Sequence, residues 1–365
     1  MIKFKNKMNR VMDKEPALET SAQDGNKSAK KKKSIIRIIA FRFMMGVVIL
    51  LMSIVLFFFG VLTLIHYGPY PKTQALFVNT VMETSAAKFM AKWYLSDEKI
   101  KSIIENNSVG DFEDITTNAG EIAIPSMDPK DTTGLEIIDI KGGTYKGKLM
   151  IVKDPSRIVV AAIPKFGEGL GQRTHDIIIA NNAVAGINAG GFLDNYGKGD
   201  GGTPDGIIIQ KGQLMFGSLT GTYNVIGFDK ENVLVLGKMT GKQALDKNIQ
   251  EAVSFGPFLI INGESAQALG TGGGLNPRTA IGQRKDGAVL LLVIDGRQPS
   301  SLGALYTDLI DIMLEYGAYN AANLDGGSST VMVFENKIIN TCVSLYGPRK
   351  TPTAIIVKGK GSIQK

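Results

Sequence analysis

The chain has 365 residues, of which 44% are hydrophobic, and a formal net charge of +7. The first 42 residues hold 12 of the 41 basic side chains and 4 of the 34 acidic ones, so the remainder is close to neutral and gives no sign of a nucleic-acid-binding domain. Cys342 is the one cysteine, which excludes an internal disulfide. The length allows one large domain or two small ones.

The N-terminal part contains a long apolar run. Residues 1–34 are polar and charged, and we expect them to be disordered. Residues 43–65 carry no charge, and as a helix they span about 35 Å, enough to cross a hydrocarbon core of about 30 Å. We therefore predict a transmembrane helix. A cleaved signal peptide fits less well, because the run is long and no Ala-x-Ala site follows it; a buried core helix is a weaker alternative.

Basic residues precede this span, and their distribution predicts its orientation. The cluster comprises Lys30, Lys31, Lys32, Lys33, Arg37 and Arg42, whereas residues 66–80 contain one lysine. By the positive-inside rule, residues 1–42 form a cytoplasmic basic tail and everything after Ile65 is extracytoplasmic. We expect a single-pass protein of the cell membrane, held by one N-terminal helix, with no nucleic-acid partner.

Residues 66–134 are expected to form an extracytoplasmic helical stalk and linker. The segment 76–94 has apolar residues spaced like one helix face, and 97–107 reads as a second short helix. Residues 118–133 are rich in Gly, Pro, Asp and Thr. We place a domain boundary near Gly134.

Residues 135–358 form the main predicted domain, in which short apolar runs alternate with turn residues. The predicted strands are 136–140, 148–152, 157–163, 207–210, 214–216, 258–261, 278–283 and 288–294. Helices are predicted over 174–182 and 302–316. Hairpins outnumber strand-helix-strand units, which favours an α+β fold with a mostly antiparallel sheet and a few packed helices. Residues 359–365 are a C-terminal tail.

The residue types limit the chemistry. The domain has one histidine, His175, at a predicted helix start, and Cys342 has no histidine nearby, so nucleophilic triads and zinc sites are unsupported. Asp194, Asn195 and Asp200 lie in a Gly-rich loop and offer oxygen ligands, but their spacing does not match an EF-hand. We expect no metal or other cofactor, with Ca²⁺ as the one alternative.

Five polar, Gly-rich clusters stand where apolar runs end. They are residues 188–192, 201–206, 276–279, 295–297 and 323–330. Any one of them can be an ordinary turn, but five at strand ends favour a site. The last cluster combines Asp325 with two glycines and three hydroxyls, and glycine lets a ligand approach backbone amides closely.

The charged members of these clusters suit an anionic substrate. Arg278 and Arg297 can each hold phosphate or carboxylate oxygens with two parallel hydrogen bonds. Asp295 and Asp325 can then act as nucleophile, general base or ion-pair partner. Glycosidic cleavage usually needs two carboxyl groups, but a phosphate leaves as a stable anion, so anion binding matters more than acid catalysis.

Five motifs in this order resemble the phosphodiester glycosidase family. They are Gly-Ile-Asn-Ala-Gly-Gly-Phe at 186–192, Gly-Pro-Phe-Leu-Ile at 256–260, Arg-Thr-Ala-Ile-Gly at 278–282, Asp-Gly-Arg at 295–297 and Leu-Asp-Gly-Gly-Ser-Ser-Thr at 324–330. The resemblance covers residues 135–357. It implies a hydrolase that cuts the bond between a sugar anomeric carbon and a phosphodiester, with bacterial relatives associated with exopolysaccharide.

The resemblance also implies which residues form the site. Asp325 is expected as general base or nucleophile and Asp295 as its acid or orienting partner. Arg278 is expected on the phosphate, and Asn188 with Ser328 on sugar hydroxyls. Many members have a third glycine where this chain has Ser328. Gly191 is also carried over by its motif. The five polar clusters supply the other expected substrate-binding residues, which are Gly190, Asp205, Thr279, Arg297, Gly326, Gly327 and Ser329.

The sequence therefore predicts a membrane-anchored extracytoplasmic glycosidase acting on a sugar phosphodiester of a cell-envelope or exopolysaccharide glycan. The alternative is a non-catalytic, membrane-tethered module that binds phosphorylated envelope polysaccharide, for which both carboxylates would be dispensable. An assembly scaffold built on the helix at 76–94 is a third hypothesis.

Overall fold

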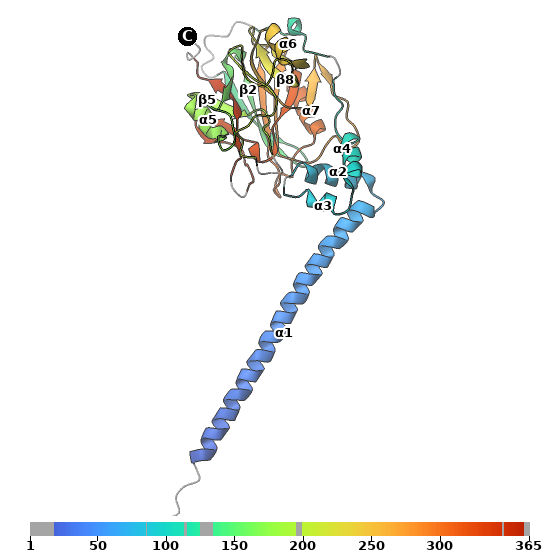
Figure 1. Cartoon of the computed structure of the whole chain (residues 1–365), viewed down its shortest axis with the longest axis vertical. Coiled ribbons are helices and arrows are strands. Elements are labelled where there is room, and N and C mark those ends of the chain that lie inside the picture. The colour runs from blue at the N-terminus through green and yellow to red at the C-terminus, as the bar shows by residue number, and fades with distance from the viewer. Residues whose placement is uncertain are drawn as a thin grey trace, which may run out of the picture. The chain divides into compact units, whose positions relative to one another are not determined.

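The computed structural model describes residues 18–84, 86–112, 115–124, 134–194, 199–344 and 347–360, with side chains from Lys30 onward. The chain divides into two compact units that meet between Leu64 and Ile65. Figure 1 shows the elements of both units.

The first unit consists of the long helix α1, which covers Leu18–Tyr67 and continues into the start of the second unit. Its stretch Lys30–Tyr67 is long and apolar enough to cross a membrane, which suits an anchor or a signal sequence. The predicted span lies inside this helix. The predicted disorder of residues 1–34 is wrong from Leu18 onward, where the chain is helical. Extending an existing helix by one residue costs the conformational entropy of that residue and gains one hydrogen bond, so the helix continues beyond the apolar stretch. Residues 1–17 lie outside the described residues.

Three short helices open the second unit: α2 (Pro71–Met82), α3 (Phe89–Lys92) and α4 (Asp97–Glu105). Val78, Val81, Ile100 and Ile103 form their common core. The helix predicted over 97–107 is confirmed as α4. The single helix predicted over 76–94 is wrong, because α2 ends at Met82 and the next residue binds arginines of the sheet domain.

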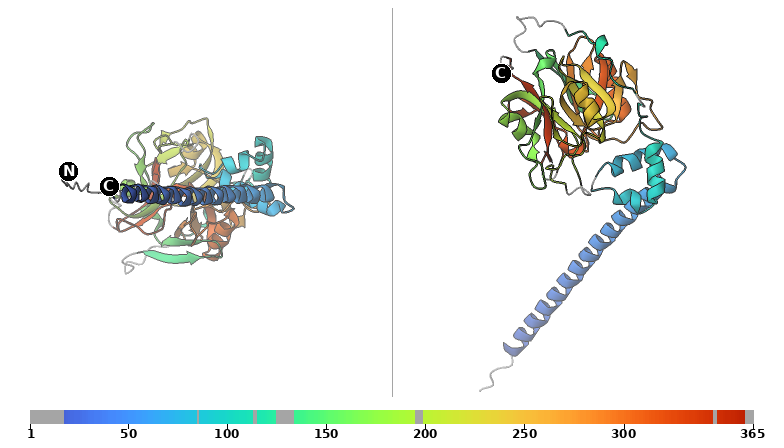
Figure 2. Two further views of the ribbon diagram at one scale, coloured as in Figure 1. Left: turned by 90° about the horizontal axis from the view of Figure 1, so that it is seen from below. Right: turned by 45° about the horizontal axis from the view of Figure 1, so that its top comes forward.

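The residues after α4 pack onto the sheet domain. The amide of Gly110 donates to the carbonyl of Gln267 (2.8 Å), and that of Leu269 donates to Ser108 (2.8 Å). Thr117 exchanges hydrogen bonds with the backbone of Leu236, just before a short 3-10 turn, η1 (Ala119–Glu121). Residues 65–124 therefore belong to the same compact unit as the sheets (Figure 2).

The largest sheet has seven antiparallel strands. In spatial order they are β1 (Leu135–Lys141), β2 (Lys146–Val152), β14 (Val289–Ile294), β13 (Arg278–Arg284), β15 (Ala318–Leu324), β11 (Phe258–Ile261) and β12 (Glu264–Ser265). Helix α7 (Tyr306–Glu315) packs on it, with Leu309 and Met313 fully buried.

Two five-stranded antiparallel sheets complete the domain. The first is β7 (Gln213–Phe216), β6 (Ile208–Gln210), β10 (Ile249–Ser254), β8 (Thr222–Asp229) and β9 (Leu234–Thr240). The second is β17 (Lys337–Ile338), β16 (Met332–Phe334), β5 (Ala183–Asn188), β19 (Thr353–Lys358) and β3 (Ile158–Ala162). Smaller elements are the ribbon of β18 (Lys350–Thr351) and β4 (Gln172–Arg173), helices α5 (Thr174–Ala180) and α6 (Gly241–Asp246), and the 3-10 turns η2 (Pro155–Arg157) and η4 (Gly327–Ser329).

The α+β prediction with a mostly antiparallel sheet is confirmed, and so are the hairpins β1–β2, β6–β7, β11–β12 and β13–β14. The helix predicted over 302–316 begins at Tyr306 instead. The amides of residues 302–304 donate to the carbonyls of Thr144 and Asn276 and so are not part of the helix. The helix starts after Leu305, whose amide donates to the Asp308 carboxylate. The helix predicted over 174–182 ends at Ala180.

The sheets share one apolar core, and its strands end together at one edge. Ile187, Leu291 and Leu324 from three strands are fully buried in it. Thr279 is paired with Leu324, and Arg278 with Ile294. The residues that follow β14 and β15 therefore emerge beside the first residue of β13, and this edge carries the site.

We expect Gln283→Leu to lower the free energy of unfolding by about 2–4 kcal/mol, since it leaves several buried polar groups without partners. The Gln283 side chain is fully buried; it accepts from the Leu234 amide (2.6 Å) and donates to the carbonyls of Asn232 (2.9 Å) and Gly287 (3.1 Å). It thereby ties the seven-stranded sheet to β9. Urea unfolding measures the loss. The exposed Gln213→Leu is the matched control, and equal midpoints for the two variants would contradict this role.

Candidate active site

The Asp325 turn lies directly after β15, and its glycines allow close packing. A Cβ at Gly326 would stand 2.7 Å from the carbonyl oxygen of Pro277. Gly327 has a φ of +61°, in the left-handed region that disfavours side chains, and its amide donates to the same carbonyl (2.9 Å). Glycine at both positions thus brings the turn against the loop that leads into β13.

Asn188 fixes the conformation of this turn through three hydrogen bonds. Its side chain is fully buried; Nδ2 donates to the backbone carbonyl of Asp325, and Oδ1 accepts from Thr279 Oγ1 (2.9 Å) and from the Val331 amide (3.1 Å). Asn188 and Thr279 are expected from the sequence to contact substrate. In the structure, their side chains instead connect β5, β13 and both ends of the Asp325 turn.

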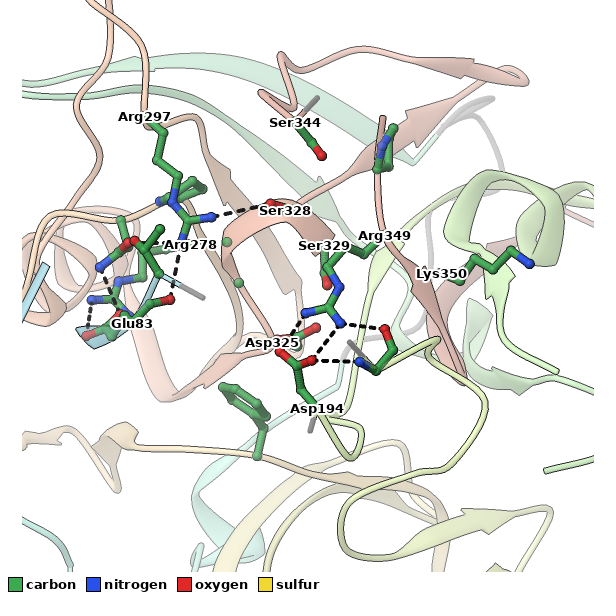
Figure 3. A pocket seen from close by; sticks show the side chains of 18 of the residues that line it. Glu83, Asp194, Arg278, Arg297, Asp325, Ser328, Ser329, Ser344, Arg349 and Lys350 are labelled. Carbon is green, nitrogen blue, oxygen red and sulfur yellow. Dashed lines mark hydrogen bonds and ion pairs between the residues drawn. The ribbon is translucent and has the colours of Figure 1, made fainter. Parts of the chain in front are cut away.

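A pocket of about 650 Å³ opens above the turn. Figure 3 shows two groups of charged side chains in it. Asp325 lies with Asp194 and Arg349, and on the other side of Ser328 lie Arg297, Arg278 and Glu83. These two groups contain two arginine-carboxylate pairs, together with one further carboxyl group and one further guanidinium.

The two groups of charged side chains include three carboxyl groups, those of Glu83, Asp194 and Asp325. Among the described residues, Asp325 alone of the three forms no ion pair with an arginine. Its Oδ2 is buried and has no hydrogen-bond partner among the described residues. Burial raises the pKa of Asp325 to about 6, against hydrogen bonds from Ser329 and Gly326 and the charge of Arg349, which lower it. A carboxyl group with this pKa exchanges protons near neutral pH.

Asp194 is held as an anion close by. Arg349 donates to both of its oxygens (2.8 and 2.9 Å), and the Arg349 guanidinium stacks 4.6 Å from the Phe192 ring. This bidentate pair lowers the pKa of Asp194, and the negative charge of Asp194 raises that of Asp325. The two carboxyl groups therefore have pKa values shifted in opposite directions, as acid-base pairs in active sites do.

Arg297 presents a guanidinium with neutral partners. Nη1 donates to Ser328 Oγ (3.3 Å), and Nη2 donates to Asn276 Oδ1 (3.2 Å) and to the Glu83 carbonyl (3.3 Å). No carboxylate of the described residues forms an ion pair with it. Its backbone φ is +58°, a conformation that costs roughly 1–2 kcal/mol outside glycine and is typical of functional sites. Arg297 is therefore suited to bind an anion.

Arg278, expected on the phosphate, is already occupied. It is 4% exposed and pairs with Glu83 (Nη1 to Oε2, 2.7 Å). Its other donors contact the carbonyls of Ala304 (3.2 Å) and Gly274 (2.8 Å), and its guanidinium lies 4.0 Å from the Tyr306 ring centroid. Arg278 thus forms part of the pocket wall, with its positive charge compensated by Glu83.

Three residues that line the pocket each have a buried polar atom without a partner among the described residues: Arg297 Nε, Asn323 Oδ1 and Asp325 Oδ2. Native proteins leave few such groups unpaired, because each costs about 1–3 kcal/mol. The wall of one pocket therefore contains an unpaired donor, an unpaired acceptor and a titratable carboxyl group, which is the arrangement expected near a polar ligand.

The structure brings only some of the expected residues to the pocket. Its lining includes Arg278, Arg297, Asp325, Gly326, Gly327, Ser328 and Ser329, and does not include Asn188, Gly190, Gly191, Asp205, Thr279 or Asp295. Asp295 instead accepts from the Asn340 side chain (3.1 Å) and the Thr341 amide (2.9 Å). Burial raises the pKa of Asp295. Gly190 and Gly191 leave room for Val253 and Phe255.

Sequence reasoning missed Glu83 and Arg349, and it considered Asp194 only for Ca²⁺. No local pattern marks Glu83 or Arg349, because each meets its partner across more than 150 positions of the chain. Among the proposed Ca²⁺ ligands, Asp194 is paired with Arg349 and Asp200 accepts from the amides of Gly169 and Gly202. Asn195 lies outside the described residues.

The chain is similar to known proteins over this region. It is 32% identical over 168 residues to the SPbeta prophage-derived protein YomE of Bacillus subtilis (strain 168). The matched stretch covers 43% of this chain and 25% of YomE. The chain thus matches about a quarter of that relative's length. The zebrafish N-acetylglucosamine-1-phosphodiester alpha-N-acetylglucosaminidase catalytic domain, solved in a form auto-inhibited by its pro-peptide, shares the fold. Its TM-score is 0.53 at 20% identity, covering 67% of this chain and 87% of that one.

Residues 181–358 match the model of the phosphodiester glycosidase family. They include β5, β13, β14 and β15, the Asp325 turn, and the Asp194–Arg349 pair. The resemblance seen in the sequence motifs is therefore confirmed. Residues 181–358 therefore form a domain of the phosphodiester glycosidase family, which is a family of hydrolases.

Proposed function

We propose that this pocket hydrolyses the bond between a sugar anomeric carbon and a phosphodiester. The observation that carries the proposal is Asp325, which lines the same pocket as the Arg297–Ser328 pair and whose Oδ2 has no partner among the described residues. A base and an anion site in one pocket suit a substrate whose leaving group is a phosphate. A carboxyl group whose pKa is raised by burial, in the same pocket as an anion site, is typical of catalytic sites and favours hydrolysis over simple binding.

In this mechanism Asp325 is the general base. Its ionised carboxylate takes a proton from a water molecule as the water oxygen bonds to the anomeric carbon. The bond from that carbon to the phosphate oxygen breaks, and its electron pair leaves with the phosphate. The leaving phosphate monoester gains negative charge, which Arg297 and Ser328 stabilise through hydrogen bonds.

Asp194 has a different role in the proposal. Because Arg349 lowers its pKa, Asp194 stays ionised and cannot supply a proton near neutral pH. A fixed carboxylate near the sugar stabilises the positive charge that develops at the anomeric centre of an oxocarbenium-like transition state. Asp194 thus replaces Asp295, which does not line the pocket, as the second carboxylate of the mechanism.

We further propose that α1 anchors the protein in the cell membrane, with its N-terminus in the cytoplasm and the domain outside. The apolar stretch Lys30–Tyr67 and the basic residues before Phe43 support this topology. The substrate would then be a phosphodiester-containing glycan of the envelope or an exopolysaccharide. Arg173 and Lys350, which line the pocket from paired positions of β4 and β18, suit such an anionic polymer.

Asp325→Asn should lower kcat/KM by about 10²–10⁴-fold, the usual worth of a general base. The assay is release of free sugar from a panel of sugar-1-phosphate methyl diesters. Asp246→Asn, on the exposed helix α6, is the control and should keep full activity. Full turnover by Asp325→Asn would reject the mechanism, and glycan binding without turnover by the wild type would favour the binding module.

The same substitution should raise the melting temperature at pH 8. The folded pKa of Asp325, about 6, exceeds the ordinary value of 3.8, so folding takes up a proton between these values and stability falls as pH rises through this window. The amide side chain of the variant carries no charge to bury, so the gap between variant and wild type should close towards pH 4. A constant gap across pH 4–8 would show that the Asp325 charge is not the cause.

The pH dependence of activity tests the direction of proton transfer. As a base, Asp325 must be ionised, so kcat/KM should rise about tenfold per pH unit below pH 6 and level off above it. If Asp325 were the general acid, activity would instead fall above pH 6. Initial rates between pH 4.5 and 8.5 distinguish the two.

Arg297→Gln should raise both KM and the inhibition constant of inorganic phosphate at least tenfold, since the variant loses the charge facing the leaving group. Arg297→Lys should restore little, because a single ammonium cannot reach Ser328 and Asn276 together. Arg284→Gln, which removes an arginine that pairs with Asp286 at the β13–β14 turn, is the control. Unchanged phosphate inhibition in Arg297→Gln would remove Arg297 from the anion site.

A further inference from the structure

Glu83 reaches the pocket from outside the family region. It directly follows α2, about 100 positions before residue 181, where the family match begins. Together with Thr84 and Ala86 it lines the same pocket as Asp325 and Arg297. The segment expected to be a stalk therefore supplies part of the pocket wall (Figure 3).

The Glu83 carboxylate compensates the charge of Arg278. Oε2 lies 2.7 Å from Arg278 Nη1, and Oε1 accepts from Nη2 at 3.2 Å, so the pair is bidentate. The Arg278 side chain is 5% exposed, and that of Glu83 is 32% exposed. Removing one partner of such a pair leaves a buried charge without compensation, which is strongly unfavourable.

Glu83 also connects to Arg297. Asn276 Nδ2 donates to Glu83 Oε2 (3.0 Å), and Asn276 Oδ1 accepts from Arg297 Nη2 (3.2 Å). The same Nη2 donates to the Glu83 carbonyl (3.3 Å). The Glu83 carbonyl therefore holds Nη2 of Arg297 directly, and the Glu83 side chain holds it through Asn276. Nη1 donates to Ser328, and Nε has no partner among the described residues.

We propose that Glu83 is a positioning residue that orients Arg297 for the phosphate of the substrate, and that α2 and the residues following it are part of the catalytic unit. This rests on the proposed function of Arg297. Glu83 keeps Arg278 neutralised, so the guanidinium with an uncompensated charge is the one beside Ser328. Its carboxylate binds Arg278 and Asn276 and leaves Nη1 of Arg297, beside Ser328, for the ligand.

The docking of α2 makes this contact specific. Thr80 Oγ1 accepts from the Leu275 amide (3.0 Å), one residue before Asn276. Gly274 lies against the backbone of Thr80, where a Cβ has no room. The loop that carries Asn276 into β13 is thus packed directly on the last turns of α2. This packing sets where Glu83 meets the arginines.

The test uses the full chain in detergent micelles, with turnover of a sugar-1-phosphate methyl diester and inhibition by inorganic phosphate. Glu83→Gln keeps the shape but removes the charge. We expect KM and the phosphate inhibition constant to rise together, at least tenfold. Glu83→Asp should restore part of the loss, because it retains the charge at a shorter reach. If Glu83→Gln does not fold, Asn276→Ala tests the same link and should weaken phosphate inhibition equally.

Glu105→Gln is the matched control, because it removes the same charge from helix α4, where the exposed Glu105 lies 3.7 Å from Lys101, and it should leave both constants unchanged. A merely structural role predicts that Glu83→Gln lowers the melting temperature and leaves both constants unchanged. That result, or a Glu83→Gln variant as active as the wild type or more so, would overturn the proposal.

Calorimetric titration of the same variants with inorganic phosphate separates this inference from the proposed function. Weaker phosphate binding in Glu83→Gln, without turnover by the wild type, would support the positioning role and reject the hydrolysis. Turnover by the wild type with equal phosphate affinity in both proteins would do the reverse.

Discussion

The buried side chain of Asn188 joins two sheets at the point where the pocket is built. Its amide group binds the Asp325 carbonyl, and its oxygen accepts from Thr279 and Val331. An amide side chain can donate and accept at once, so one residue at the end of β5 fixes both the entry and the exit of the Asp325 turn. The depth of the Asp325 carboxyl group, and hence its raised pKa, depends on this linkage.

Of the charged side chains on either side of Ser328, four form two ion pairs, and two form no ion pair with the described residues. Glu83 neutralises Arg278, and Arg349 neutralises Asp194. Asp325 and Arg297 are left, one with a raised pKa and the other with neutral partners. A negatively charged substrate that loses a phosphate needs this combination: a base for water and a cation for the leaving group. In the proposed mechanism the paired residues form the pocket walls, and Asp325 and Arg297 act on the substrate.

Much of this could be predicted from the chain itself. Polar, Gly-rich clusters at strand ends identified the turn and the loops around it, because chemistry that needs close backbone approach requires glycine at those places. Asp325, Arg297 and Ser328 do line the pocket. The same clusters also contain residues such as Asn188, Thr279 and Asp295, which hold the loops in place. A polar residue at a strand end looks identical in sequence whether it faces substrate or a neighbouring loop.

The sequence by itself determined the apolar N-terminal helix, the antiparallel character of the domain and the strand ends where the site would lie, since these follow from periodicity, length and turn chemistry over short ranges. Only the tertiary structure decided which charges are compensated. Arg278 and Arg297 are both arginines at strand ends, yet Arg278 is paired with the Glu83 carboxylate, whereas Arg297 has neutral partners that include the Glu83 carbonyl. That difference arises between segments almost 200 positions apart in the chain. No local pattern carries it, because whether a charge meets a partner depends on the folded path of the backbone.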